Sequence, residues 1–146
     1  MPRFLTDTSC MVVAVCSWHE HHTCAATEIE RRLGHGEDLF VAAAGLVELY
    51  AVLTQLPPPH RLSPLDAKQL VAANFMDGMA QIVALGAGSY RQILDTAPER
   101  NIAGGATYDA VIMASALAAH VDVLLTFNDR QFRTLTDLGV EIVVPG

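Results

Sequence analysis

Acidic side chains from distant parts of the sequence give the clearest chemical signal. The candidates are Asp7, Glu48, Asp109 and Asp129, with Asn128 beside the last of them. Mg²⁺ and Mn²⁺ prefer hard oxygen ligands, and Mg²⁺ keeps several waters while one or two carboxylates hold it. One or two such ions can drive phosphodiester hydrolysis without a Ser, Cys or His nucleophile. If these side chains meet, the sequence predicts a metal-dependent phosphodiesterase centre.

The pattern of apolar residues predicts the elements that would bring them together. Short apolar runs predict strands at 3–6, 39–42, 81–85, 123–126 and 140–144. Helical patterns, some with Gly or Pro at their ends, are expected over 10–16, 20–33, 46–53, from 64 onward, 89–97 and 107–120. Continuous apolar strands that alternate with helices are typical of a parallel sheet covered on both faces. We therefore expect an α/β fold, a three-layer α/β/α sandwich with a short, mostly parallel sheet.

Ligands of such a sheet bind beyond the carboxyl ends of its strands, which is where the acids are expected. Asp7 follows the first strand, and Asn128 and Asp129 follow the fourth. Asp109 lies near the start of the helix that precedes the fourth strand. Glu48 interrupts an apolar segment, and an acid without a partner is costly there, so a partner or a pocket is expected.

Each acid also has a simpler structural interpretation. Asp7 could cap a helix, and Asp109 could favour the positive end of its own helix by about 0.3–1 kcal/mol. Asn128 and Asp129 could form a turn, and Glu48 could be solvated. Their joint placement at one predicted edge, rather than any single position, favours the metal centre.

Composition limits the class of protein. The 146 residues are 51% hydrophobic, which fits one folded domain spanning 1–146. No apolar run approaches the roughly 20 residues of a membrane span, and the N-terminus is unlike a secretory signal, so a cytoplasmic location without membrane contact is expected. Three cysteines without a C-x-x-C pair are interpreted as reduced packing residues. The net charge of -7 argues against a broad phosphate-binding surface, although bound metal would supply positive charge locally.

A cluster of His19, His21, His22 and Cys24 raises the question of zinc. The order H-x-H-H-x-C is not an established ligand spacing, and four ligands within six residues do not easily close a tetrahedron. We interpret the cluster as the polar start of a helix.

At the acidic positions the sequence resembles the PIN-domain family, and within it the VapC-type toxins of bacterial toxin–antitoxin pairs. The resemblance covers nearly the whole chain, and the segments that carry it are 4–9, 46–49, 108–110 and 124–132. It implies an α/β/α sandwich and an Mg²⁺-dependent endoribonuclease in which Mn²⁺ can substitute. It also implies an RNA substrate and neutralisation by a cognate antitoxin protein.

The resemblance assigns catalytic and metal-binding roles to Asp7, Glu48 and Asp109. Members of the family often have an acid two residues after the position of Thr126, where this chain has Asn128. The fourth ligand is therefore Asn128, or Asp129 in its place, or is absent.

Three further residues are expected near this centre. Thr8 and Thr126 could hold waters or orient the carboxylates. Arg130 adjoins the predicted site and could contact RNA phosphates. A separate surplus of apolar residues around Pro57–Pro59 suggests a groove for a homodimer or antitoxin contact, formed by Leu53, Leu56, Leu62, Leu65 and Leu70.

Other functions compete with this interpretation. A phosphatase with an Asp nucleophile needs a second Asp where Ser9 stands and a Lys near the site, and the single lysine is Lys68 on a predicted helix. A non-catalytic RNA- or protein-binding module would bind without metal. An RNA-processing nuclease of the same family remains an alternative to a toxin, although the small size favours the toxin.

Overall fold

A five-stranded parallel sheet forms the centre of the protein in the computed structural model, which describes residues 2–135 and 139–146. The strand order is β3-β2-β1-β4-β5, and every neighbouring pair is parallel. The strands are β1 (Arg3–Thr6), β2 (Asp38–Ala42), β3 (Gln81–Val83), β4 (Val123–Leu125) and β5 (Glu141–Val143). All five predicted strands are present, and three of them are shorter than predicted.

Helices connect the strands, largely where the sequence predicted them. They are α1 (Thr8–Val15), α2 (His22–Gly34), α3 (Ala43–Leu53), α4 (Pro64–Val71) with a π-helical turn (Ala72–Met76), α5 (Ala87–Thr96), α6 (Gly105–Ala118) and α7 (Asp129–Leu135). Two details differ from expectation. The first helix, expected over 10–16, begins earlier, at Thr8, because Asp7 caps α1 directly. The sequence analysis also missed α7, where it expected only a turn.

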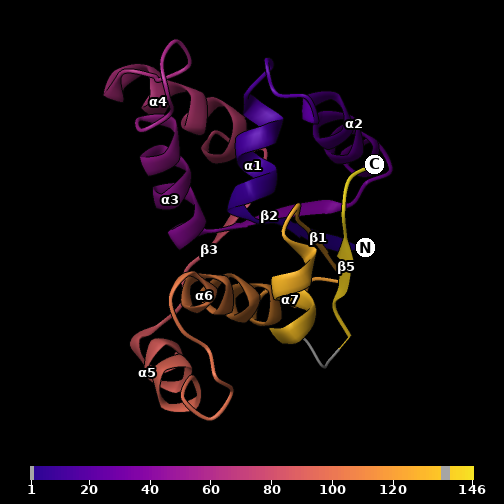
Figure 1. Ribbon diagram of the computed structural model, residues 1–146. Coiled ribbons are helices and arrows are strands. Elements are labelled where there is room, and N and C mark those ends of the chain that lie inside the picture. The colour runs from indigo at the N-terminus through magenta and orange to yellow at the C-terminus, as the bar shows by residue number, and fades with distance from the viewer. Residues whose placement is uncertain (1, 136–138) are drawn as a thin grey trace.

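The helices form two layers, which confirms the predicted sandwich. Helices α1 to α4 lie on one side of the sheet, and α5, α6 and α7 lie on the other (Figure 1). Alternate strand residues enter different cores: Phe4 packs with the α1–α4 layer, whereas Leu5 packs with α6 and α7. Because both faces of each central strand are buried, the strands are apolar throughout rather than alternating.

The apolar residues near Pro57–Pro59 are mostly part of the core and do not form the expected groove. Leu53 is fully buried, and Leu56, Leu62 and Leu70 pack against the core of the α1–α4 layer. Only Leu65 of this group is largely exposed. Cys10 and Cys16 are also buried, and all three cysteines are free, as expected. In the described part of the chain no helix is long and apolar enough to cross a membrane.

Candidate metal centre

The candidate centre lies at the carboxyl ends of the two neighbouring strands β1 and β4. After β1 the chain passes through α1 and α2 on one side of the sheet, whereas it reaches β4 from α6 on the other side (Figure 1). The strand order therefore reverses between β1 and β4, and ligands of open α/β sheets bind at such a point. The backbone amide of Asp7 donates to the carbonyl of Leu125, so the two chain segments remain paired where the strands end.

Asp7 is held by donors from both segments. The Ser9 hydroxyl lies 2.8 Å and 3.0 Å from its two carboxylate oxygens, and the Cys10 amide donates to Oδ1 at 2.9 Å. Thr126 donates its hydroxyl hydrogen to Oδ2. The Cys10 contact caps α1, so the capping interpretation of Asp7 is correct, and it is compatible with a place in the acidic centre.

Burial makes the Asp7 carboxyl hard to ionise. Its side chain is almost fully enclosed, and this desolvation raises its pKa from 3.8 to about 6. The hydrogen bonds from Thr126, Cys10 and Ser9 act in the opposite direction, and the charge of Asp109 raises the pKa further. A cation beside Asp7 would favour its ionised form.

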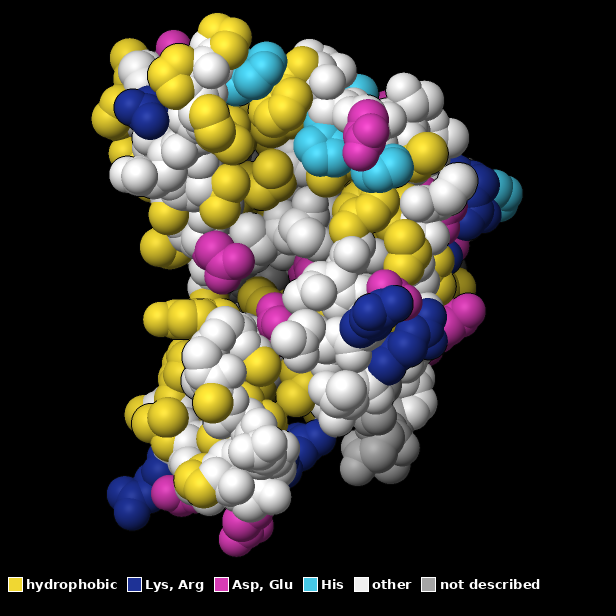
Figure 2. Space-filling model, in the orientation of Figure 1, with side chains coloured by type: hydrophobic (Ala, Val, Ile, Leu, Met, Phe, Trp, Pro, Cys, Tyr) yellow, Lys and Arg dark blue, Asp and Glu magenta, His cyan; other side chains and the backbone are white. Residues whose placement is uncertain are grey.

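Asp7, Glu48 and Asp109 meet at one small cavity. The cavity has a volume of about 110 Å³, and its lining also includes Thr8, Ser9, Ile112 and Asn128. Burial and the charge of Glu48 raise the pKa of Asp109, so this carboxyl also lies in a negative environment. On this face, acidic side chains border the hollow between the two helical layers (Figure 2).

The residues at this cavity fit a hydrated divalent cation. Three carboxylates, from the end of β1, from α3 and from α6, supply the hard oxygen donors that Mg²⁺ and Mn²⁺ prefer. Thr8 lines the same cavity, and its hydroxyl is buried and has no hydrogen-bond partner within the described chain. Within residues 2–135 and 139–146, no three acid, His or Cys side chains are close enough to ligate one ion directly.

Asn128 and Asp129 are neighbours with different surroundings. Asn128 lines the cavity, and its side-chain amide lies 3.4 Å from Oδ2 of Asp109. Its backbone amide donates to the Thr126 hydroxyl at 2.8 Å. Asp129 begins α7 and faces Arg133, at 3.3 Å, and it does not line the cavity. The alternative of Asp129 as the fourth ligand therefore has no support from this geometry, and Arg130 is exposed beside the site.

Ser9 is a site residue that the sequence analysis did not single out. Its hydroxyl contacts both oxygens of Asp7 and accepts the backbone amide of Phe127 at 3.0 Å. It therefore links β1, α1 and the segment after β4. The available signal was the polar run Asp7-Thr8-Ser9 directly after an apolar strand.

The side chains of the histidine cluster have separate contacts, and in the described part of the chain no three acid, His or Cys side chains are grouped around a possible metal position. His22 turns away and donates from Nδ1 to the carbonyl of Val13 at 3.0 Å. His21 instead stacks on Phe127.

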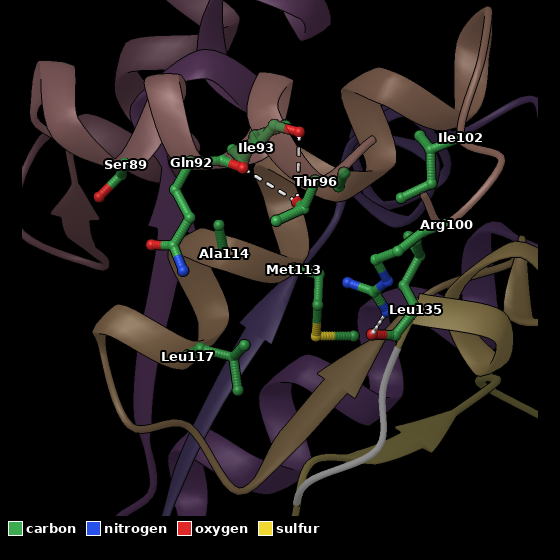
Figure 3. A pocket seen from close by; sticks show the side chains of 11 residues that line it. Ser89, Gln92, Ile93, Thr96, Arg100, Ile102, Met113, Ala114, Leu117 and Leu135 are labelled. Carbon is green, nitrogen blue, oxygen red and sulfur yellow. Dashed lines mark hydrogen bonds between the residues drawn. The ribbon is translucent and has the colours of Figure 1, made fainter. Parts of the chain in front are cut away.

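Two further hollows flank α5 and α6. One, of about 270 Å³, lies between these helices and α7, and Figure 3 shows Arg100 beside Leu135 at one side of it, where Arg100 donates to the carbonyl of Leu135. None of the described residues that line it carries a carboxylate. The other is an apolar groove of about 780 Å³ between α3, α5 and α6, and Glu48 and Asp109 lie at its edge.

Comparison with known proteins gives a consistent result at three levels. The model of the family described as "PIN domain" matches residues 4–137. Ribonuclease VapC40 of Mycobacterium tuberculosis is 40% identical over 140 residues, which cover 93% of this chain and 94% of that protein. Ribonuclease VapC27 of the same species is 30% identical over 143 residues, which cover 98% of this chain and 97% of that protein.

Solved structures show the same fold at much lower identity. VapBC2 from Rickettsia felis, bound to a DNA fragment from the VapBC2 promoter, contains a chain with a TM-score of 0.68. That chain is 14% identical, and the match covers 97% of this chain and 98% of that one.

Proposed function

We propose, because this chain belongs to the PIN domain family, that it is a metal-dependent endoribonuclease and the toxin of a toxin–antitoxin pair. The relatives named ribonuclease VapC40 and VapC27 support the activity, since each matches nearly the whole chain. The main support for the proposal is the cavity at the carboxyl ends of β1 and β4, where Asp7, Glu48 and Asp109 meet. We also propose a cytoplasmic location, because its RNA substrate would be found there.

The three carboxylates are proposed to hold Mg²⁺ together, with waters of the ion between it and those carboxylates that do not reach it, and Mn²⁺ can substitute. When bound, the ion supplies the positive charge that makes water a better nucleophile and that stabilises charge on the phosphate. Asn128 has a positioning role in this proposal, because its amide lies beside the carboxylate of Asp109. Asp129 is left out of the ligand set because it faces Arg133.

The remaining residues fix the centre and meet the substrate. Ser9, Thr126 and the Cys10 amide hold both oxygens of Asp7, so that carboxylate need not reorganise when RNA arrives. Thr8 offers its unpartnered hydroxyl to a water or a ligand at the cavity. Arg130 is exposed at the start of α7, and its proposed role is to contact an RNA phosphate through its planar guanidinium.

The experiment that tests the nuclease is cleavage of mixed RNA by purified protein with Mg²⁺, with Mn²⁺ and with chelator. Asp7→Asn and Asp109→Asn are each expected to reduce cleavage at least about a hundredfold, because each removes a charged ligand. Asp95→Asn is the matched control, because Asp95 is an exposed acid on α5 whose carboxylate faces Arg91. Metal-independent cleavage, or full cleavage by both site variants, would contradict the proposal.

The toxin role needs a test of its own. Expression of the chain is expected to arrest growth, and co-expression of the antitoxin, sought in a short gene just upstream, is expected to restore it. Cleavage in vitro without growth arrest would favour an RNA-processing nuclease instead. RNA binding without metal and without cleavage would favour a non-catalytic module.

The apolar groove between α3, α5 and α6 is the surface that we propose for a homodimer. Val47, Leu94 and Tyr108 lie along it with 71%, 66% and 68% of their surface exposed, and contiguous apolar patches of this kind mark protein interfaces. Light scattering is expected to show a dimer that Leu94→Glu dissociates. Leu65→Glu, which changes an exposed leucine outside the groove, should leave the dimer intact. A monomeric unmodified protein would contradict this assignment.

A further inference from the structure

A further hollow, separate from the two beside α5 and α6, adjoins the acidic cavity on the side of Ser9. We call it the histidine hollow; it has a volume of about 520 Å³ and is lined by Ser9, Val12, Val13, His19, Glu20, His21 and Phe127. Ser9 lines both hollows, and its hydroxyl contacts Asp7. Phe127 faces the histidine hollow while the next residue, Asn128, faces the acidic cavity. A ligand that extends past Ser9 would therefore reach both.

The rings around this hollow form a continuous row. His21 stacks on Phe127 with their centroids 5.6 Å apart and their planes at 18°, and His19 follows at 5.7 Å from His21. Trp18 continues the row at 5.9 Å from His19 and is itself stacked on His60. Histidine side chains gather around an acidic one on this part of the surface (Figure 2).

Much of this ring surface is open to solvent. The His21 side chain, which lines the hollow, is 53% exposed, and Trp18, which lies outside the hollow and stacks on His60, is 48% exposed. Exposed rings at a site are suited to stacking, because every nucleobase has a π-face that can lie on an aromatic or imidazole ring.

His19 and Glu20 add polar groups at the edge of the row. The backbone amide of His21 donates to Nδ1 of His19 at 3.1 Å, so the neutral His19 ring carries its hydrogen on Nε2. The hydrogen bond at Nδ1 orients the His19 ring, and its Nε2–H can donate to a ligand. The Glu20 carboxylate lines the same hollow, where its Oε1 lies 3.4 Å from Nε2 of His21, and its exposed oxygens can accept further hydrogen bonds. Nucleobase edges present both donors and acceptors, so they complement this pair.

We propose that the histidine hollow is a nucleobase subsite, which takes the base of a nucleotide next to the phosphate held at the acidic cavity. The inference rests on the proposed ribonuclease function and adds a place where part of the substrate is recognised. A phosphate is the less suitable occupant, because Glu20 lines the hollow and the chain carries a net charge of -7. The rings and their polar edge instead suit an unstacked base of single-stranded RNA.

The test is binding of a short, fluorescently labelled single-stranded RNA, measured by anisotropy with Ca²⁺ in place of Mg²⁺, so that a cation is available at the acidic cavity, under conditions where the strand is shown to remain uncut. A strand of equal length made of abasic nucleotides provides the same phosphates without bases. His21→Ala is expected to weaken RNA binding about tenfold and to leave binding of the abasic strand unchanged, since stacking on one ring is lost. His21→Phe should retain the affinity because it keeps a flat face. His35→Ala, which removes an exposed histidine at the end of α2, is the matched control.

Three outcomes would overturn the subsite. They are equal RNA binding by His21→Ala and the unmodified protein, equal losses for the RNA and the abasic strand, and failure of His21→Phe to restore binding. The first would leave the hollow as a surface for a protein partner, and the second would indicate a contact with the phosphates. The nuclease proposal fails separately, because it is tested by metal-dependent cleavage. Base-dependent binding through His21 without cleavage would retain the subsite and reject the nuclease.

Discussion

Thr126 donates a hydrogen bond to Asp7 across a separation of 119 residues in the chain. The contact exists because β1 and β4 are parallel neighbours, with Thr6 paired to Leu125, so the residues that follow the two strands emerge side by side. The Thr126 hydroxyl also accepts the backbone amide of Asn128 at 2.8 Å. One buried hydroxyl thus fixes an acid of the candidate centre and the segment that carries Asn128.

Replacing this hydroxyl tests its role. Thr126→Val keeps the shape but removes both hydrogen bonds, so we expect a loss of about 1–3 kcal/mol in the free energy of unfolding, measured by urea denaturation. Because Asp7 loses a donor that orients it, RNA cleavage should fall about tenfold. Thr126→Ser retains the hydroxyl and should lose much less of both. Unchanged cleavage in Thr126→Val would mean that the contact is only structural.

The raised pKa of Asp7 predicts how the stability of the metal-free protein depends on pH. Its pKa is about 6 in the folded chain and near 3.8 when unfolded, so between these values the folded chain holds a proton that the unfolded chain has released. Raising the pH through this window therefore lowers stability, by about 3 kcal/mol for a change of this size.

The Asp7→Asn variant tests this, because its side chain cannot ionise at this position. Denaturation midpoints from pH 4 to pH 7, measured in chelator, should fall less steeply in this variant than in the unmodified protein. Parallel pH profiles would show that ionisation of Asp7 does not oppose folding.

Binding of a divalent cation should reverse this effect. An ion among the three carboxylates stabilises their charged forms, so Mg²⁺ or Mn²⁺ should raise the melting temperature, and more at pH 7 than at pH 5. At about one hundred times the dissociation constant the gain is about 2.7 kcal/mol. Calorimetry should show no such gain for Asp109→Asn, whereas Asp95→Asn should behave like the unmodified protein. An equal gain in Asp109→Asn would place the ion elsewhere.

The neighbours Asn128 and Asp129 should differ in their effect on cleavage. Asn128→Ala removes the amide beside Asp109, and we expect a 10- to 100-fold loss of activity, as is typical when a group that orients a ligand is removed. Asp129→Ala removes only the partner of Arg133 at the start of α7 and should keep most of the activity. Initial rates with Mg²⁺ would check both, and the reverse order of losses would restore Asp129 as the acidic ligand.

Much of the architecture could be predicted because its causes are local. The apolar runs that became β1, β2 and β4 are buried on both faces, and this favours a parallel sheet with helices on both sides. The helix α7 was missed because its start, Asn128-Asp129, is also typical of a turn. The leucines near Pro57–Pro59 were misassigned because exposure depends on what packs over a residue, and spacing does not report this.

The sequence by itself determined that short buried strands alternate with helices and that acids follow or flank them, because residue type and spacing set these features. Only the tertiary structure decided that β4 lies beside β1, and this places Thr126 and Asn128 next to Asp7. It also decided that Asn128 rather than Asp129 lines the cavity, since α7 begins at Asp129 and directs that side chain to Arg133. Strand order and side-chain direction depend on how the whole chain packs, and no local pattern specifies either.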